Sequence, residues 1–289
     1  MASMTLLHLR DHRGDGRPLV LLHGAGRSLV DWDTAATALA AVGHRVLAID
    51  LPGHGRSPDL SPWDVPGVVR LIAETLEAYE VPEAVAVGTS LGGLVAVEYA
   101  RAYPDRTRAA VNLDGFWWGR PGEYPGAERV GKSLRSSAGA VVPPEYIGQQ
   151  VAQCALYGIP AGPAEVAARA AVRPLPDGSW QMLPERSAAL EMYAELDRLG
   201  ALGVTRWLDG VRCPLLLVQA GKPDPLPTPE WFDDLQVRFA RGLSAELTEL
   251  ARVRPTVTFT SVDATHAMVQ EVPEAVAELV SGFVHGLSG

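Results

Sequence analysis

The chain has 289 residues, of which 47% are hydrophobic and 20% charged, a composition typical of globular proteins that bury a sizeable core. A formal net charge of −9 and an isoelectric point near 5.3 argue against a nucleic-acid-binding protein, which needs clustered Lys and Arg. The two cysteines, Cys154 and Cys213, are too few for a disulfide framework and lack metal-ligand spacing. Both are predicted to be buried structural residues, and no metal site is expected.

The N-terminus has no charged segment followed by a long apolar stretch, so no secretory signal is predicted. No apolar run reaches the roughly 18 residues of a membrane span. A soluble, cytoplasmic protein without membrane or nucleic-acid partners is therefore expected. The sequence gives no indication of the oligomeric state.

Apolar strands alternate with helices along the first part of the chain. The strands are predicted at 17–22, 44–50, 83–88 and 106–113, and the helices at 31–43, 65–81 and 91–104. Uninterrupted apolar strands separated by helices indicate a parallel sheet that is covered on both faces, and hence an α/β fold.

The alternation lapses between residues 116 and 210, where Ala-rich helical segments and polar loops follow one another without a comparable strand. It resumes with a strand at 213–221, a long helix at 229–250, a strand at 254–262 and a final helix at 272–287. The chain is therefore predicted to form one α/β core, residues 1–115 and 211–289, interrupted by a helical insertion.

The segment "VAVGTSLGGLV" (85–95) places Ser90 between a buried strand and an apolar helix, with Gly88, Gly92 and Gly93 around it. Glycines without Cβ atoms let backbone segments approach closely at such a sharp turn. This G-x-S-x-G pattern, in its strand–turn–helix context, is a nucleophile elbow, which predicts that Ser90 is a catalytic nucleophile. A simple glycine turn with a serine N-cap is the alternative.

A serine nucleophile needs a base and an acid that orients the base, and in this arrangement they follow in the order Ser, acid, His. Only His266 and His285 follow Ser90. His285 lies in the final helix and is predicted to be a surface residue, whereas His266 follows the last strand and is predicted to be the base.

Two aspartates follow strands and are candidates for the acid. Asp224 lies in the proline-flanked segment "GKPDP", which stiffens the loop around it, and is preferred. Asp114 follows the strand that ends at residue 113 and remains the alternative. The oxyanion donors are predicted to be the amides of Leu91, directly after the nucleophile, and of Ala25, in the "HGAG" turn.

Together, "HGAG", "DLPGHGRS", "GTSLGG", "GKPD" and the histidine after the last strand resemble the α/β-hydrolase family in kind and order. The resemblance covers nearly the whole chain. It implies a mostly parallel eight-stranded sheet with a helical cap, about 116–210, inserted after the sixth strand. The stretch from Asp224 to His266 is longer than the family pattern, which keeps Asp114 open as the acid.

The expected activity is that of a serine hydrolase without a cofactor, acting through an acyl-enzyme on a small or medium ester, thioester or lactone. The alternatives are a biosynthetic enzyme of this fold that performs cyclisation, C–C cleavage or decarboxylation, and a hydrolase-like ligand receptor. The composition is that of a high-GC bacterium. Four aromatic residues at the start of the insertion either line the substrate pocket or pack the insertion onto the core: Phe116, Trp117, Trp118 and Tyr124.

Overall fold

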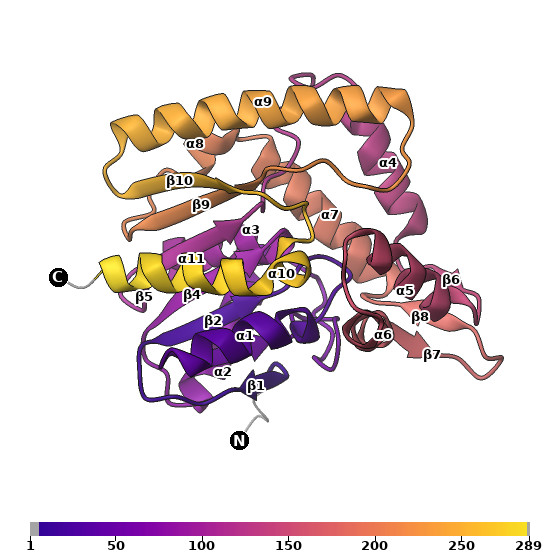
Figure 1. Cartoon of the computed structure of the whole chain (residues 1–289), viewed down its shortest axis with the longest axis horizontal. Coiled ribbons are helices and arrows are strands. Elements are labelled where there is room, and N and C mark those ends of the chain that lie inside the picture. The colour runs from indigo at the N-terminus through magenta and orange to yellow at the C-terminus, as the bar shows by residue number, and fades with distance from the viewer. Residues whose placement is uncertain (1–5, 288–289) are drawn as a thin grey trace.

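The computed structural model describes residues 6–287, in which seven strands form the main sheet (Figure 1). The order across the sheet is β1 (Leu9–Asp11), β3 (Arg45–Ile49), β2 (Pro18–Leu22), β4 (Ala84–Thr89), β5 (Thr107–Leu113), β9 (Leu215–Ala220) and β10 (Val257–Val262). β1 pairs antiparallel with β3, and the other pairs are parallel.

The prediction of a mostly parallel sheet is thus confirmed, whereas the eighth strand is not found within the described residues. The described chain has only one strand ahead of β2, the three-residue β1. Residues 1–5 lie outside the described part of the chain.

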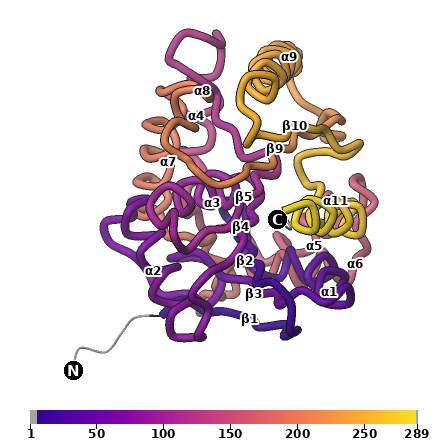
Figure 2. The backbone as a smooth tube through the Cα atoms, turned by 90° about the vertical axis from the view of Figure 1, so that its left-hand side faces the viewer, coloured from indigo at the N-terminus to yellow at the C-terminus, as the bar shows by residue number. Residues whose placement is uncertain are grey.

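Helices cover both faces of the sheet (Figure 2). The helices α1 (Asp33–Ala41) and α11 (Pro273–Gly286) pack together on one face, and α2 (Val65–Ala78) and α3 (Leu91–Ala102) pack on the other. The strand β2 shows why both layers are needed, because its alternate residues feed opposite core clusters. Leu19 and Leu21 point to the α1 side and Val20 and Leu22 to the α2 side, all of them fully buried.

The segment between β5 and β9 is called the insertion below. It contains α4 (Ala127–Ser137), α5 (Tyr146–Leu156), α6 (Ala161–Ala170), α7 (Arg186–Gly200) and α8 (Val204–Trp207). It also contains an antiparallel sheet of β6 (Val141–Val142), β8 (Trp180–Met182) and β7 (Val172–Pro174). In Figure 1, α5, α6 and the three short strands lie at the lower right, α4 at the upper right, and α7 and α8 behind the sheet.

The insertion is mainly helical, as predicted, but the sequence analysis did not predict this small sheet. The three extra strands have only two or three residues each, too few to show an alternating pattern in the sequence. The insertion does begin where the sequence placed it, after the strand that ends at Leu113, but this is the fifth strand of the chain and not the sixth.

The helix α7 attaches the insertion to the core. The carboxylate of Glu191 accepts a hydrogen bond from the amide of Trp63 (2.7 Å), and that of Glu195 accepts one from the amide of Val65, at the first residue of α2 (3.2 Å). Acidic groups at a helix N-terminus are favoured by its unpaired amides and its dipole. Glu191 thus holds two parts of the fold together.

The long helix α9 (Glu230–Val253) follows β9 and runs along the upper edge in Figure 1, beside α8. A short 3-10 helix, η1 (Leu29–Trp32), precedes α1, and α10 (Met268–Glu271) precedes α11. Over residues 6–287, no helix combines the length and the apolar character needed to cross a lipid bilayer.

Candidate functional site

The candidate site lies where the order of the strands reverses. The chain passes from β2 to β3 on one side and then returns to β4 on the other side of β2. At such a point the loops after the two strands diverge and leave a crevice beyond their carboxyl ends. The loop after β2 carries the "HGAG" turn, and the loop after β4 carries Ser90.

Ser90 sits in a backbone conformation that L residues rarely adopt, with φ 53° and ψ −123°. The surrounding glycines make this turn possible. A Cβ on Gly88 would lie 2.0 Å from the carbonyl oxygen of Gly92, and a Cβ on Gly92 would lie 2.1 Å from that of Leu22. A Cβ on Gly93 would lie 2.6 Å from a side-chain oxygen of Asn112. The strained conformation of Ser90 is held by this close packing, as at many functional turns.

The turn after β2 lies against Ser90. A Cβ on Gly24 would be 3.3 Å from the Cβ of Ser90 and 3.7 Å from its hydroxyl oxygen. His23 is fully buried, and its Nδ1 lies 2.8 Å from the Gly24 carbonyl oxygen while its Nε2 accepts the amide of Leu51 at 2.9 Å. His23 is therefore a structural histidine that braces the turn. Burial, partly offset by the charge of Asp50, lowers the pKa of His23.

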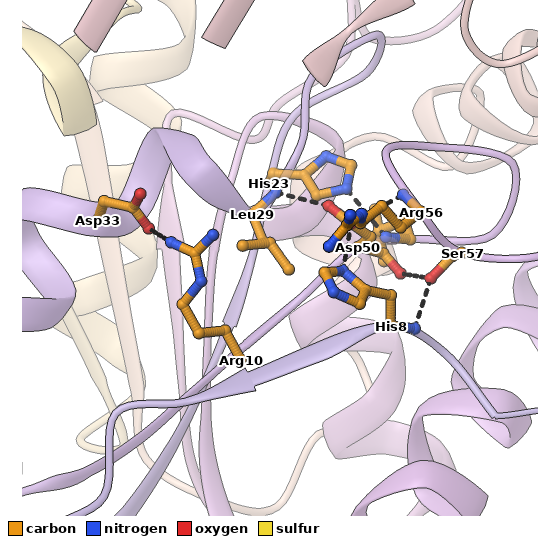
Figure 3. Close-up of polar contacts among 9 residues, drawn as sticks. His8, Arg10, His23, Leu29, Asp33, Asp50, Arg56 and Ser57 are labelled. Carbon is orange, nitrogen blue, oxygen red and sulfur yellow. Dashed lines mark hydrogen bonds and ion pairs between the residues drawn. The ribbon is translucent and has the colours of Figure 1, made fainter. Parts of the chain in front are cut away.

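Asp50 joins this turn to the loop after β3 (Figure 3). Its carboxylate is 2% exposed, accepts the amides of Leu29 (2.7 Å) and Arg56 (3.0 Å), and lies 2.8 Å from Nδ1 of His8. Its carbonyl oxygen accepts the hydroxyl of Ser57 at 2.6 Å. These bonds fix the "DLPGHGRS" loop and the start of η1 to each other, and they thereby fix the turn that faces Ser90.

His266 contacts Asp114, and the expectation that it contacts Asp224 is wrong. Nδ1 of His266 lies 2.6 Å from Oδ2 of Asp114, whose other oxygen accepts the amide of Ala220 at 3.0 Å. Asp224 instead accepts the hydroxyl of Tyr157 at 2.7 Å. The structure therefore favours Asp114, the alternative candidate, as the partner of the imidazole.

The loops after β5, β9 and β10 explain this difference. Beyond β9 the chain stays paired to the chain beyond β10, through Gly221 to Val262 (2.8 Å) and Lys222 to Ala264 (2.9 Å). The loop that carries Asp224 begins only after these bonds. Asp114 follows β5 directly, with φ 52°. The Asn112 side chain accepts the amide of Gly115 and donates to the carbonyl oxygen of Gly115.

Three influences act on the pKa of His266. Desolvation lowers the pKa, but the hydrogen bond and charge of Asp114, together with the charge of Asp224, outweigh desolvation and raise the pKa above 6.5. Because a carboxylate accepts a proton at Nδ1, the neutral ring presents an unprotonated Nε2. That nitrogen is free to accept a proton from a nucleophile.

Ser90 and His266 line one cavity of about 340 Å³ together with Asp224. Its other walls are the turn after β2, the helix α10 region and one face of α5 extended by one residue, which carries Gln150, Gln153, Cys154 and Tyr157. Within the hydrogen bonds of residues 6–287, none joins the Ser90 hydroxyl to His266. Catalytic hydrogen bonds are often longer without a substrate and shorten when one binds.

The four aromatic residues at the start of the insertion lie outside this cavity. Trp117 stacks on Tyr193 with ring centroids 6.3 Å apart and donates to Asp197, and Trp118 packs on Phe239 at 4.9 Å. Trp117 thus packs within the insertion, whereas Trp118 packs the insertion onto α9 of the core. Of the two interpretations left open by the sequence, the geometry favours packing over lining of the substrate pocket.

Cys154 differs from its prediction as a buried residue, because it is partly exposed and lines the cavity. Burial raises the pKa of its thiol, so it is a weakly polar part of the wall. Cys213 is also only partly buried. The cavity residues of α5 were missed by the sequence analysis, although positions 150, 153, 154 and 157 have the spacing of one helix face.

The two predicted oxyanion donors, Leu91 and Ala25, lie near Ser90. The amide of Leu91 belongs to the first residue of α3, where helical amides lack an intrahelical acceptor. Ala25 lines the cavity next to Gly24. Among residues 6–287, neither amide donates a hydrogen bond to another protein group. Leu91 does not itself line the cavity, so the binding of an oxyanion by the two amides stays a prediction.

A parallel sheet with a serine at a strand–helix turn and an imidazole at the same sheet edge is the arrangement found in α/β-hydrolase proteins. Residues 19–279 match the model of the Alpha/beta hydrolase family, and the chain belongs to that family. It is a hydrolase-family protein whose relatives act on several kinds of bond.

Among curated relatives, the chain is 40% identical over 102 residues to a putative non-heme haloperoxidase of Mycobacterium phage D29. That match covers 35% of the chain and 37% of the relative. A match to a putative carbamate hydrolase RutD of Variovorax paradoxus, 33% identical, covers 41% of the chain and 45% of that relative. The chain thus spans less than half the length of these two relatives. The putative carbamate hydrolase RutD of Azorhizobium caulinodans is 28% identical over 272 residues, covering 93% of the chain and 92% of that protein.

Solved structures share the fold along almost the whole chain. An E-2-(acetamidomethylene)succinate hydrolase superposes with a TM-score of 0.71 at 21% identity, covering 96% of this chain and 95% of that one. A thermophilic esterase from Thermogutta terrifontis gives 0.67 at 20% identity, with 98% and 94% covered. An enol-lactonase from Burkholderia xenovorans gives 0.59 at 17% identity, with 96% of each chain covered.

Proposed function

We propose that the protein is a serine hydrolase that cleaves a small or medium ester, thioester or lactone through an acyl-enzyme. One observation carries the proposal. Ser90, in a strained strand–helix turn, shares a cavity with His266, whose other ring nitrogen lies 2.6 Å from the carboxylate of Asp114. A nucleophile, a base and an acid in this order form the triad of acyl-transfer enzymes.

In the acylation step the Ser90 hydroxyl oxygen attacks the substrate carbonyl, and Nε2 of His266 takes the hydroxyl proton. The imidazolium that forms is stabilised by the carboxylate of Asp114, which also keeps the ring oriented. The negative charge on the carbonyl oxygen is bound by the amides of Ala25 and Leu91. His266 then returns the proton to the leaving group.

In the deacylation step a water molecule takes the place of the leaving group. His266 removes its proton while the water attacks the acyl carbonyl, and the acid product leaves Ser90 with its hydroxyl restored. The residues need no cofactor for either step. The expected partner is a small molecule that fits the 340 Å³ cavity.

We assign residues 116–210 the role of a cap over a core of residues 1–115 and 211–289. The support comes from α5, because it belongs to the insertion and supplies one wall of the cavity that holds Ser90. The insertion therefore determines which substrates reach the nucleophile, while the sheet positions the groups that react.

A fluorophosphonate probe and p-nitrophenyl butyrate test the function together. We expect native protein to be labelled stoichiometrically and to hydrolyse the ester, and Ser90→Ala to lose labelling and about three or more orders of magnitude in kcat/KM. Ser187→Ala, at an exposed serine on α7, is the matched control. Native protein that is neither labelled nor active would refute acyl transfer at this serine, and ligand binding without turnover would then favour a receptor.

Carbamate cleavage is a second candidate, favoured by the nearly full-length likeness to the putative carbamate hydrolase of A. caulinodans. The same residues serve both reactions, because a carbamate carbonyl is attacked by the same nucleophile and its oxygen needs the same two donors. A phenyl carbamate and a phenyl ester of equal size distinguish the two. Faster release of phenol from the carbamate, relative to alkaline hydrolysis, favours the second candidate.

A further inference from the structure

Asp224 lines the cavity but does not contact the imidazole, so it takes no direct part in the proton transfers described above. The inference that follows rests on the proposed hydrolase function and concerns its substrate. An uncompensated charge on the wall of a small cavity acts on any charged group that enters it, because water screens it only in part.

The position of this carboxylate is fixed by two hydrogen bonds to the same oxygen. Oδ1 of Asp224 accepts the hydroxyl of Tyr157 at 2.7 Å and the amide of Leu226 at 2.9 Å. Its Oδ2 accepts no hydrogen bond from any residue within the described range 6–287. The carboxylate therefore keeps one oxygen available to a donor on a ligand.

The other charges that line the cavity cancel each other. Arg27 forms a two-pronged ion pair with Asp31, with distances of 2.6 and 2.9 Å, and also donates to the side-chain oxygen of Gln270 at 2.6 Å. The nearby Lys222 pairs at 3.2 Å with the exposed Asp263 and is not part of the cavity wall. Asp224 is thus the unpaired charge among the cavity-lining residues of the described chain.

The remaining polar groups of the wall are uncharged amides and hydroxyls, from Gln150, Gln153 and Thr89 among others. Such groups can bind donors or acceptors, but they do not compensate a negative charge. A carboxylate-bearing substrate would meet repulsion here without a free cation to bind it, whereas an ammonium group would meet a suitable partner.

We propose that Asp224 is a specificity-determining residue that selects substrates with a cationic group near the scissile carbonyl and disfavours substrates that carry a carboxylate. Tyr157 orients it. Asp224 was the predicted acid of the triad. Because Asp114 contacts His266 instead, Asp224 is available to recognise the substrate.

Three butyrate esters test this without changing the acyl-enzyme: butyrylcholine, its uncharged isostere 3,3-dimethylbutyl butyrate, and 3-carboxypropyl butyrate. All three form the same butyryl-Ser90, so their kcat/KM values differ only through binding and acylation. Each value is divided by the alkaline hydrolysis rate of the ester. We expect the cation to exceed the anion by at least about tenfold, with the neutral ester between them and the ratio falling as salt is raised.

Two variants separate recognition from mere support of the loop. Asp224→Asn is expected to abolish the preference for the cation, while Tyr157→Phe, which keeps the charge, is expected to retain most of it. Asp263→Asn, with the same loss of charge at a position outside the cavity, is the matched control and should retain the preference.

The outcomes distinguish this inference from the proposed function. If the neutral ester is hydrolysed but the cation-to-anion ratio is near one in native protein, or is the same in Asp224→Asn, the inference is overturned and the hydrolase stands. If Asp224→Asn and Tyr157→Phe slow all three esters equally, the pair only supports the loop, which also overturns it. If no ester is hydrolysed and Ser90 is not labelled, the proposed function itself has failed.

Discussion

Replacement of Asp114 by Asn removes the carboxylate that faces the imidazole and leaves the size of the side chain unchanged. The carboxylate oxygen lies 2.6 Å from Nδ1 of His266, so the charge centres of carboxylate and imidazolium are about 4 Å apart. At an effective dielectric constant near 20, that separation corresponds to about 4 kcal/mol. The imidazole is 58% exposed to the cavity, so solvent screening reduces this to roughly 3 kcal/mol.

A loss of about 3 kcal/mol in the transition state lowers kcat/KM by roughly a hundredfold or more. The assay is hydrolysis of p-nitrophenyl butyrate by Asp114→Asn, with thermal unfolding as a check that the variant is folded. Asp224→Asn is the comparison, because it removes a carboxylate from the same cavity that does not contact the ring. We expect it to lose less than about tenfold on this neutral ester. The reverse order of the two effects would refute the assignment of Asp114 as the acid.

Three further predictions follow from the same geometry. His266 must be neutral to accept a proton, and its pKa is raised, so kcat/KM should rise with pH through a midpoint above 6.5. In Asp114→Asn the carboxylate no longer opposes the effect of burial on the imidazole, so the midpoint should move to lower pH. An unchanged midpoint would contradict the cause given for the shift. In Gly92→Ala the new Cβ would lie 2.1 Å from a backbone oxygen, so urea titration should show a free energy of unfolding lower by about 3 kcal/mol or more. Gly282→Ala on α11, where the space around the Cβ is open, is the control and should not lower the free energy of unfolding. Asp50→Asn, which replaces a buried acceptor of two amides, should cost about 2–4 kcal/mol in urea unfolding, and an unshifted midpoint would show that the hydrogen bonds of this carboxylate do not stabilise the fold.

The strands and helices of the core could be predicted because each has a strong local signal. The largely buried strands β2 and β9 consist mostly of apolar residues, and α3 follows its strand directly through the glycine turn. Ser90 and His266 could be singled out for the same reason, since one lies in a distinctive turn and the other is the histidine that directly follows a strand. Each of these predictions needed only residues close together in the sequence.

The partner of His266 could not be predicted with the same means, because Asp114 and Asp224 both follow strands of one sheet edge. Their separation depends on how far the chain beyond β9 stays paired with the chain beyond β10, which is a property of three dimensions. The prolines around Asp224 predict a rigid loop, but a rigid loop does not determine where the side chain points. The positive φ of Asp114, with a glycine after it, was the more useful feature, but it is visible only in the structure.

The cavity wall formed by α5 was missed because its residues are polar. Gln150, Gln153 and Tyr157 share a face by their spacing, but a polar helix face normally indicates solvent. Only the packing of the insertion over the sheet turns that face toward Ser90. Likewise, the aromatic residues at the start of the insertion are a strong signal of burial, but not of which surface buries them.

The attachment of the insertion has a consequence for changing the enzyme. The amide contacts made by Glu191 and Glu195 hold α7 to the start of α2, while the wall of the cavity is supplied by α5, which packs on α6. The contacts of α7 and the cavity wall on α5 therefore lie in separate stretches of the insertion, although α6 also contacts η1 of the core. Exchange of the segment 143–171 between relatives would change the wall on α5 while leaving α7 and the loop of Asp224 as they are, provided that the exchanged α6 still packs on η1.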